Sequence, residues 1–211
     1  MDDLFGRVIK KLEDAGELDN TFIIFLSDHG DMLGDRERYS KYCLYETSVR
    51  VPMILAGAGV PEHLHGTVDN RCAELVDVLP TLLHISGTDI PPELPGADLL
   101  NLPAKIGSFC EYHGGGYGKL QSAPAYMWRT DDWKLILYLE GNIPGAALRI
   151  QETKGELFNL KSDPHEFNNL YDNNEYTHIR ERMTRDLLMH LAVSWAKYPR
   201  QYAMKSGLTT A

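Results

Sequence analysis

Two short runs of consecutive apolar residues most constrain the fold of this chain. Residues 21–26 and 51–55 are apolar, β-branched or aromatic at nearly every position, so each predicted strand needs cover on both faces. Strands of this kind are typical of parallel sheets whose two faces are covered by helices. We therefore expect both runs to be strands of such a sheet.

Two segments with the apolar spacing of a helix accompany these strands. Apolar residues recur at helical intervals over residues 4–12, and Gly16 follows at the C-cap position. The same spacing returns over residues 73–85, and Gly87 ends it. Within this second helix, Asp77 is expected to be an N-cap or a buried hydrogen-bonding carboxylate. The alternation of helix and strand predicts an α/β fold, a layered sheet with helices.

The composition changes after about residue 90, where prolines and glycines mark an irregular connection. Further short strands are predicted at residues 106–110, 125–129, 134–139 and 156–160. The middle pair flanks a polar turn and so predicts an antiparallel hairpin, and a long amphipathic helix is predicted over residues 176–195. We therefore expect residues 1–120 to belong to an α/β domain and residues 121–211 to form a small α+β subdomain.

The overall composition argues against several classes of protein. The chain has 211 residues with 21 basic and 30 acidic side chains, a net charge of −9, which does not suit nucleic-acid binding. No stretch approaches the roughly 20 apolar residues that span a bilayer, so no membrane partner is expected. The three cysteines, Cys43, Cys72 and Cys110, form no C-x-x-C pair, which argues against a disulfide framework and a structural zinc site.

The segment Ser27-Asp28-His29-Gly30-Asp31 directly follows the first apolar run and is the strongest candidate site. Ligands of open α/β sheets bind beyond the carboxyl ends of the strands, where these side chains stand. A carboxylate beside an imidazole supplies two metal ligands or an acid–base pair. If only the spacing is considered, the alternative is that this segment is a polar loop after the strand, in which an aspartate caps the next helix or strand and binds no ligand.

Further motifs follow this segment in order: Leu33-Gly34-Asp35, then Lys41, then Tyr45-Glu46, then Val49-Arg50-Val51-Pro52. Together they resemble the sulfatase family of the alkaline phosphatase superfamily, which carries S-D-[NH]-G, L-G-[DE], a lysine, Y-E and V-R-x-P at similar spacing. Residues 76–83 resemble the family's V-D-x-x-P-T-L helix, and residues 156–170 resemble its C-terminal E-L-[YF]-[DN]-L and D-P-x-E-x-x-N-L signature. The resemblance extends over nearly the whole chain and implies an alkaline-phosphatase-like layered sheet.

The resemblance implies a hydrolase of sulfate esters that uses one divalent cation. Asp28 and His29 would be two ligands of that cation, which is usually calcium in the family. An imidazole ligand also suits softer ions, so Mn²⁺ and Zn²⁺ are open alternatives. Lys41 would be the catalytic and substrate-binding cation, in contact with the sulfate group and the bridging oxygen as negative charge develops there. The expected substrate is a small sulfated molecule, an aryl sulfate or a sulfated sugar.

Other polar residues near these motifs have two interpretations. His113 stands after a predicted strand and before the glycine run 114–118, which we expect to be a loop. It either lines the substrate pocket as a substrate-binding residue or is a structural or exposed histidine. Asp31, Arg36 and Arg38 either contact the substrate or belong to a solvated charged loop.

The sequence departs from the family pattern at the nucleophile. Sulfatases use a cysteine or serine in C/S-x-P-x-R that is converted to formylglycine, and none of the three cysteines lies in that motif. An early strand that ends in Asp-Asp, the source of the other metal ligands, is not found either. We expect these elements in an N-terminal half that precedes Met1. We also expect the 211 residues alone neither to bind the metal tightly nor to turn over substrate.

Two further functions fit the same residues. Phosphonate and phosphate monoester hydrolases of the superfamily share the S-D-H-G segment and the lysine. A non-catalytic remnant that binds anions or a partner would keep these residues without chemistry. Because an incomplete sheet leaves an edge and an apolar face uncovered, we also expect self-association or pairing with the missing N-terminal half.

Overall fold

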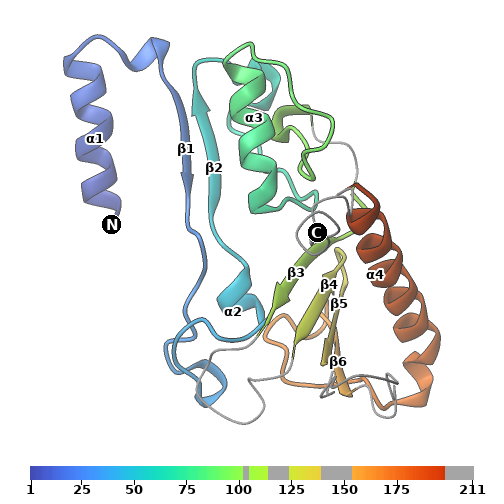
Figure 1. The fold of residues 1–211 in the computed structure, drawn as a ribbon. Helices are drawn as coiled ribbons and strands as arrows, with labels where there is room; N and C mark the ends of the chain where they lie inside the picture. Colours follow the sequence, from blue (N-terminus) through green and yellow to red (C-terminus); the bar gives the residue numbers. More distant parts are fainter. Residues whose placement is uncertain (102–104, 114–123, 139–153, 198–211) are drawn as a thin grey trace, which may run out of the picture.

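Two antiparallel sheets, each accompanied by helices, make up the part of the chain that the structure, a computed structural model, describes: residues 1–101, 105–113, 124–138 and 154–197 (Figure 1). The first sheet and its helices comprise α1 (Asp2–Asp14), β1 (Phe22–Leu26), α2 (Glu46–Val49), β2 (Met53–Gly57) and α3 (Val78–Ile85). The second sheet and its helix comprise β3 (Ser108–Tyr112), β4 (Ala125–Arg129), β5 (Trp133–Tyr138), β6 (Lys154–Asn159) and α4 (Thr177–Lys197). The helices and strands predicted from the sequence are therefore present, with shifted ends. The glycine run 114–118 lies outside the described residues.

The pairing of the first two strands corrects one prediction. β1 and β2 pair antiparallel, with Phe22 opposite Gly57 and Leu26 opposite Met53, so the parallel arrangement expected for these two strands is wrong. The apolar run showed that both faces need cover, and α1 lies beside β1 while α3 lies beside β2 (Figure 1). It carried no information on strand direction, which depends on the connection. Residues 27–52 leave the sheet as a loop with one short helix and return, rather than crossing over it as parallel pairing requires.

The second sheet has the strand order β3-β4-β5-β6, with every neighbouring pair antiparallel. This confirms the predicted hairpin, whose two strands are β4 and β5. Leu139, the last residue of the second predicted strand, lies outside the described residues. β3 precedes residue 120 and is bonded to β4, so the sheet draws strands from both sides of the expected domain boundary. That division of the chain stays a prediction.

Each face of the second sheet has its own cover. Alternate side chains of a strand point to opposite faces, so Met127 and Trp128 belong to different cores. On the Trp128 face, α4 packs through Met183 and Leu187, both of which are fully buried. The Met127 face is covered instead by the loop that follows β1, whose apolar anchors are Met32, Leu44 and Tyr45. The loop that carries the S-D-H-G segment is thus fixed to this sheet.

A buried ion pair joins α3 to the edge of the second sheet. The carboxylate of Asp77 is fully buried and accepts the ammonium of Lys105 at 2.6 and 2.7 Å, together with the backbone N–H of Ala97 at 2.8 Å. Lys105 also pairs with Glu74 at 2.7 Å, and Glu74 accepts the backbone N–H of Phe109 in β3 at 2.8 Å. This confirms Asp77 as a buried hydrogen-bonding carboxylate.

Several apolar side chains of the first sheet and its helices are exposed. They include Leu4 and Val8 on α1, Ile54 on β2, and Leu79 and Leu82 on α3. Such a set is typical of a surface that another chain or segment covers, and self-association stays a prediction. None of the helices in the described ranges is long and apolar enough to cross a membrane.

Candidate functional site

The S-D-H-G segment forms a tight turn directly after β1. The hydroxyl of Ser27 donates to the backbone carbonyl of His29 at 2.8 Å, and the N–H of His29 donates to the Asp28 carboxylate at 3.1 Å. These bonds bring the Asp28 carboxylate to 3.5 Å from Nε2 of His29. The Asp28 side chain is 82% exposed and that of His29 36%, so both groups are open to a ligand from solvent.

The hydrogen bonding of His29 fixes which ring nitrogen carries the proton. Nδ1 lies 2.7 Å from the backbone carbonyl oxygen of Gly30. Because a carbonyl oxygen only accepts hydrogen bonds, Nδ1 is the donor, and Nε2 is the ring nitrogen on the side of the Asp28 carboxylate. Histidines that bind metals in proteins show this arrangement, with the far nitrogen bonded to a carbonyl or carboxylate.

The donor set of Asp28 and His29 fits two positions around a divalent cation. A carboxylate oxygen suits calcium and manganese, and an imidazole nitrogen suits manganese and zinc. No group of three or more histidine, cysteine, aspartate or glutamate side chains able to hold a metal ion occurs within the described residues. These two side chains would therefore contribute part of a coordination shell.

Gly30 is required by a close approach of two backbone segments. Its N–H donates to the carbonyl of Ser48 at 2.7 Å, and a Cβ atom at this position would stand 2.0 Å from the carbonyl oxygen of Thr47. Any other residue would push the two segments apart. The glycine of S-D-H-G therefore has a structural reason, which is to let the turn pack against α2.

Ser48 connects the S-D-H-G turn to Lys41. Besides accepting from Gly30, the buried Ser48 donates its hydroxyl to the backbone carbonyl of Lys41 at 2.8 Å. Ser48 therefore bonds to the backbone of both Gly30 and Lys41 and keeps these two positions close together. The Lys41 side chain is exposed, and its ammonium has no ion-pair or hydrogen-bond partner among the described residues. Ser48 could not be found from the sequence, because one serine in a short helix matches no pattern.

Three of the charged residues between these points, Asp31, Arg36 and Arg38, have different roles. Asp31 accepts the backbone N–H groups of Leu33 at 3.0 Å and Ser40 at 3.1 Å, so it shapes the loop. The Arg36 guanidinium lies 4.1 Å from the centre of the Tyr45 ring and donates to the backbone carbonyl of Glu166. Both are engaged in holding the loop itself. Arg38 lies 5.7 Å from the Tyr45 ring centre, and no ion pair or hydrogen bond of its guanidinium occurs within the described ranges.

A buried cluster of charges fixes the loop to the sheet beneath it. Lys134 of β5 is fully buried and pairs with Glu46 at 3.0 Å and Glu166 at 2.8 Å. Arg129 adds a contact with Glu46 at 3.4 Å, and the second oxygen of Glu166 accepts the backbone N–H of Glu46 at 2.7 Å. The Glu46 of the Y-E motif and the Glu166 of the D-P-x-E motif thus meet at one lysine.

The two carboxylates that share Lys134 respond differently to their surroundings. Burial alone would raise the pKa of Glu46, but the charges of Lys134 and Arg129 outweigh it and hold this pKa below its usual 4.5. Burial raises the pKa of Glu166 above 4.5, because the lysine it shares with Glu46 offsets only part of the cost.

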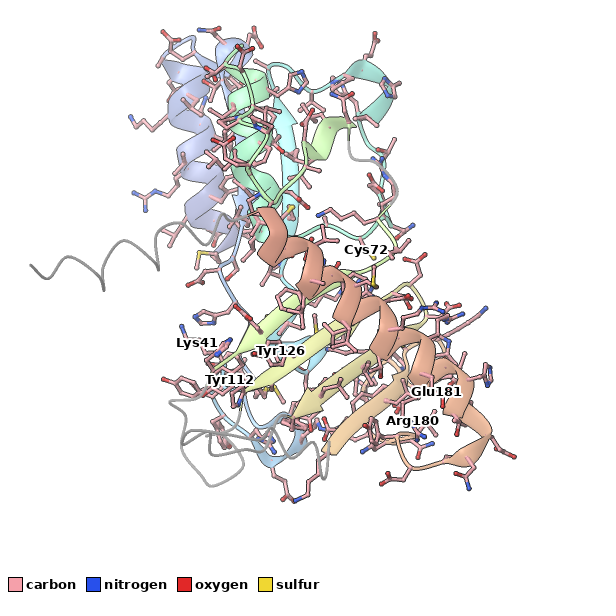
Figure 2. All side chains as sticks on the ribbon, turned by 45° about the vertical axis from the view of Figure 1, so that its right-hand side comes forward. Lys41, Cys72, Tyr112, Tyr126, Arg180 and Glu181 are labelled. Atoms are coloured by element: carbon pink, nitrogen blue, oxygen red, sulfur yellow. The ribbon has the colours of Figure 1, made fainter. Side chains whose placement is uncertain are left out.

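His113 stands apart from the other predicted site residues. Its Nε2 lies 3.1 Å from the carboxylate of Glu111, and its ring meets that of Tyr126 edge-on with 5.7 Å between centres. Tyr126 packs against the core beneath α4, whereas the loop that carries Lys41 covers the opposite face. Figure 2 nevertheless shows Lys41 close to Tyr112, and the rings of Tyr112 and Tyr42 are 6.5 Å apart. His113 and Lys41 thus share one end of the sheet without a contact between them.

Comparison with known proteins identifies the family. The family model named Sulfatase matches residues 1–88. Arylsulfatase K of Mus musculus is 31% identical over 207 residues, which is 92% of this chain and 34% of the mouse protein. The chain belongs to the sulfatase family of the alkaline phosphatase superfamily. It spans about a third of the length of the curated relatives it matches.

Solved structures agree with this assignment to the sulfatase family. BT4656 in complex with its substrate D-glucosamine-2-N,6-O-disulfate has a TM-score of 0.77 and 28% identity, over 94% of this chain and 39% of that one. A phosphonate monoester hydrolase from Silicibacter pomeroyi has a TM-score of 0.73 and 24% identity, over 90% of this chain and 38% of that one. The second likeness shows the fold alone. Both support the mixed α/β class and the alkaline-phosphatase-like arrangement expected from the sequence.

Proposed function

We propose that this chain supplies part of the active site of a sulfatase that hydrolyses sulfate monoesters. Asp28 and His29 would provide one oxygen and one nitrogen ligand of a divalent cation, with calcium preferred and Mn²⁺ and Zn²⁺ as alternatives. When bound, such a cation polarises the ester and offsets the charge of the sulfate oxygens. Lys41 would contact the sulfate group and the bridging oxygen.

The observation that carries this proposal is the bridge through Ser48. One buried residue bonds to Gly30 on one side and to Lys41 on the other, so the two ends of a loop of ten intervening residues stay together. A site for an anionic ester needs its cationic groups held in place before the substrate arrives. The bridge holds the backbone at both ends of the loop, which supports such an arrangement.

Lys41 suits the departure of the leaving group. Its ammonium has no ion-pair or hydrogen-bond partner among the described residues, so an incoming sulfate does not have to displace a carboxylate of the protein. As the ester bond breaks, negative charge grows on the bridging oxygen, and a nearby ammonium stabilises that charge. This preference for the transition state over the ground state is what accelerates a reaction.

The substrate is proposed to be small and sulfated. The relatives named arylsulfatase favour an aryl sulfate, and the substrate bound to BT4656 favours a sulfated sugar. Since no cysteine of the 211 residues lies in C-x-P-x-R, we expect no turnover from this chain alone. Sustained hydrolysis of 4-nitrophenyl sulfate by the purified chain would contradict the assignment of the nucleophile to other residues.

The metal-ligand assignment is tested with Mn²⁺ as a paramagnetic probe. Titration into the ¹⁵N-labelled chain should broaden the amide signals of residues 27–31 first. Asp28→Asn and His29→Gln should each weaken that broadening, because each removes one of two ligands. His63→Ala is the matched control, since this histidine lies in a separate exposed turn. Broadening centred elsewhere, or unchanged in both variants, would overturn the assignment.

The role of Lys41 is tested with small anionic esters. 4-Nitrophenyl sulfate should shift amide signals around residue 41, and Lys41→Ala should reduce the affinity about tenfold. Lys161→Ala is the control, because it removes an exposed lysine elsewhere in the chain. Tighter binding of 4-nitrophenyl phosphate than of the sulfate would favour the phosphate monoester alternative. Binding that Lys41→Ala leaves unchanged would contradict the proposal.

A further inference from the structure

Arg38, like Lys41, is a charged residue of the site loop whose side chain has no ion-pair or hydrogen-bond partner in the part of the chain that the structure describes. Asp31 is occupied by two backbone N–H groups, and Arg36 is occupied by the Glu166 carbonyl and the Tyr45 ring. The Arg38 side chain is partly buried, and its guanidinium lies 5.7 Å from the centre of the Tyr45 ring. A guanidinium that is partly shielded from water and carries no counter-charge is suited to an incoming anion.

Arg38 stands over a small group of polar side chains. The hydroxyls of Tyr45 and Tyr138 donate to the two oxygens of Glu156 at 2.9 and 3.2 Å. Burial and Glu156 raise the pKa of Tyr45 to about 12, and Arg38 is close enough to oppose that rise in both tyrosines. Glu156 is thus bonded to two hydroxyls, and no ion pair between it and Arg38 occurs among the described residues.

Arg38 and Lys41 lie at the same end of the second sheet. Tyr138 closes β5 and Tyr112 closes β3, and through β4 these residues are in register at one end. Arg38 is near Tyr138, while Lys41 is near Tyr112 (Figure 2). Since neighbouring strands are spaced about 4.8 Å apart, the two tyrosines are roughly 10 Å from each other. The two cations therefore stand beside different strands at one end of the same sheet.

A polar atom at this end of the sheet also has no partner. The hydroxyl of Tyr112 is shielded from solvent and makes no hydrogen bond within the described part of the chain. A buried hydroxyl that goes unsatisfied costs free energy, and such groups are found where a ligand completes them. Its place beside Lys41 adds a neutral donor to the two cations.

We propose that Arg38 binds a second anionic group of the substrate while Lys41 holds the sulfate that is cleaved, so that the preferred substrate is a sugar with two acidic groups. This inference rests on the proposed function, because it takes Lys41 as the sulfate contact. The planar fork of arginine matches a sulfate or carboxylate with two parallel hydrogen bonds. Arg38 is a specificity residue here and takes no part in bond breaking.

The test compares two sugars that differ by one anionic group. D-Glucosamine-2-N,6-O-disulfate and N-acetyl-D-glucosamine 6-sulfate are titrated into the ¹⁵N-labelled chain, and the Arg38 Nε–Hε signal and the amide signals near residue 41 are followed. With the disulfated sugar both regions should shift, and Arg38→Gln should weaken binding about tenfold. With the monosulfated sugar Arg38→Gln should change the affinity less than twofold.

Two further variants separate the possible outcomes. Arg182→Gln removes an exposed arginine of α4 and should leave both affinities unchanged, whereas Lys41→Ala should weaken both sugars. If Arg38→Gln leaves the disulfated sugar unaffected, or weakens both sugars equally, the inference is overturned while the role of Lys41 stands. If Lys41→Ala affects neither sugar, or if neither sugar binds the unmodified chain, the proposed function and the inference fail together.

Discussion

On one face of the second sheet lies α4, and on the other lies the loop between β1 and α2. The helix is held by apolar side chains, with Met183 and Leu187 packed against Trp128. The loop has apolar anchors too, but it is also joined to the sheet through the buried ammonium of Lys134 and two carboxylates. One sheet thus carries an apolar cover and a partly ionic one.

The difference concerns how precisely each cover is positioned. Apolar contact stabilises in proportion to the area buried and has no preferred direction, so a helix can shift slightly at little cost. Ion pairs and hydrogen bonds between buried groups hold only in a narrow geometry. The candidate ligands are on the loop and not on α4, so we expect the charges to set the site and α4 to set stability.

Lys134→Met breaks the ionic cover and should have the largest effect. It leaves Glu166 buried without its counter-charge and Glu46 with Arg129 alone, which should lower the free energy of unfolding by about 3–5 kcal/mol. Urea denaturation followed by circular dichroism measures this loss. Adding Glu166→Gln to the lysine variant should restore part of the stability, because it removes one unpaired charge. A loss below about 1 kcal/mol would show that the cluster does not hold the loop.

Leu187→Ala breaks the apolar cover and should have a somewhat smaller effect. Removing this fully buried side chain should cost about 3 kcal/mol in the same denaturation experiment, while the affinity for 4-nitrophenyl sulfate stays unchanged. Leu188→Ala, next to it but 57% exposed, is the control and should cost less than about 0.5 kcal/mol. A change of ligand affinity in the Leu187 variant would contradict the division between the two faces.

Glu46→Gln should give the smallest effect and one that depends on pH. The pKa of Glu46 in the folded chain is below 4.5, so its ionised form adds stability above pH 4.5 that is lost as the pH falls through the folded value. The difference in unfolding free energy between the unmodified chain and Glu46→Gln should therefore shrink at acidic pH. Denaturation series at several pH values measure it.

Glu166→Gln sharpens that result because its sign is opposite. The pKa of Glu166 is raised, so its contribution is fully present below pH 4.5 and is lost as the pH rises through the folded value. The free energy of unfolding of Glu166→Gln should therefore rise relative to that of the unmodified chain as the pH increases. Equal pH dependence in the two variants would show that Lys134 does not distinguish the two carboxylates.

Local patterns were sufficient to predict most of the fold. The hairpin of β4 and β5 follows from two apolar segments around a polar turn, and α4 follows from its apolar spacing. The pairing of β1 with β2 was not predictable in this way. Their direction is set by how residues 27–52 return to the sheet, and no apolar pattern within either strand encodes that path.

The residues of the candidate site also differ in whether local patterns were sufficient to predict them. Asp28, His29 and Lys41 were predicted because they stand within short motifs of similar order and spacing to those of the family. Ser48 and Lys134 were missed, since their roles depend on residues far from their own motifs. A lysine in an apolar strand suggests a strand at the exposed edge of a sheet. Only the fold shows that Lys134 is buried and pairs with Glu46, which lies 88 positions earlier.

The bonds of Ser48 turn residues 31–40 into a closed ring with a fixed base. The N–H of Met32 and the carbonyl of Ser40 also bond at 3.1 Å, so the base is fastened twice. Exposed residues of the ring such as Leu33 and Tyr39 can therefore be exchanged while the ends that carry His29 and Lys41 keep their places. Asp31, Met32 and Arg36 hold the loop and are not free in this way. Such a design allows a lineage to acquire new preferences by varying Arg38 and its neighbours, without rebuilding the chemistry beneath them.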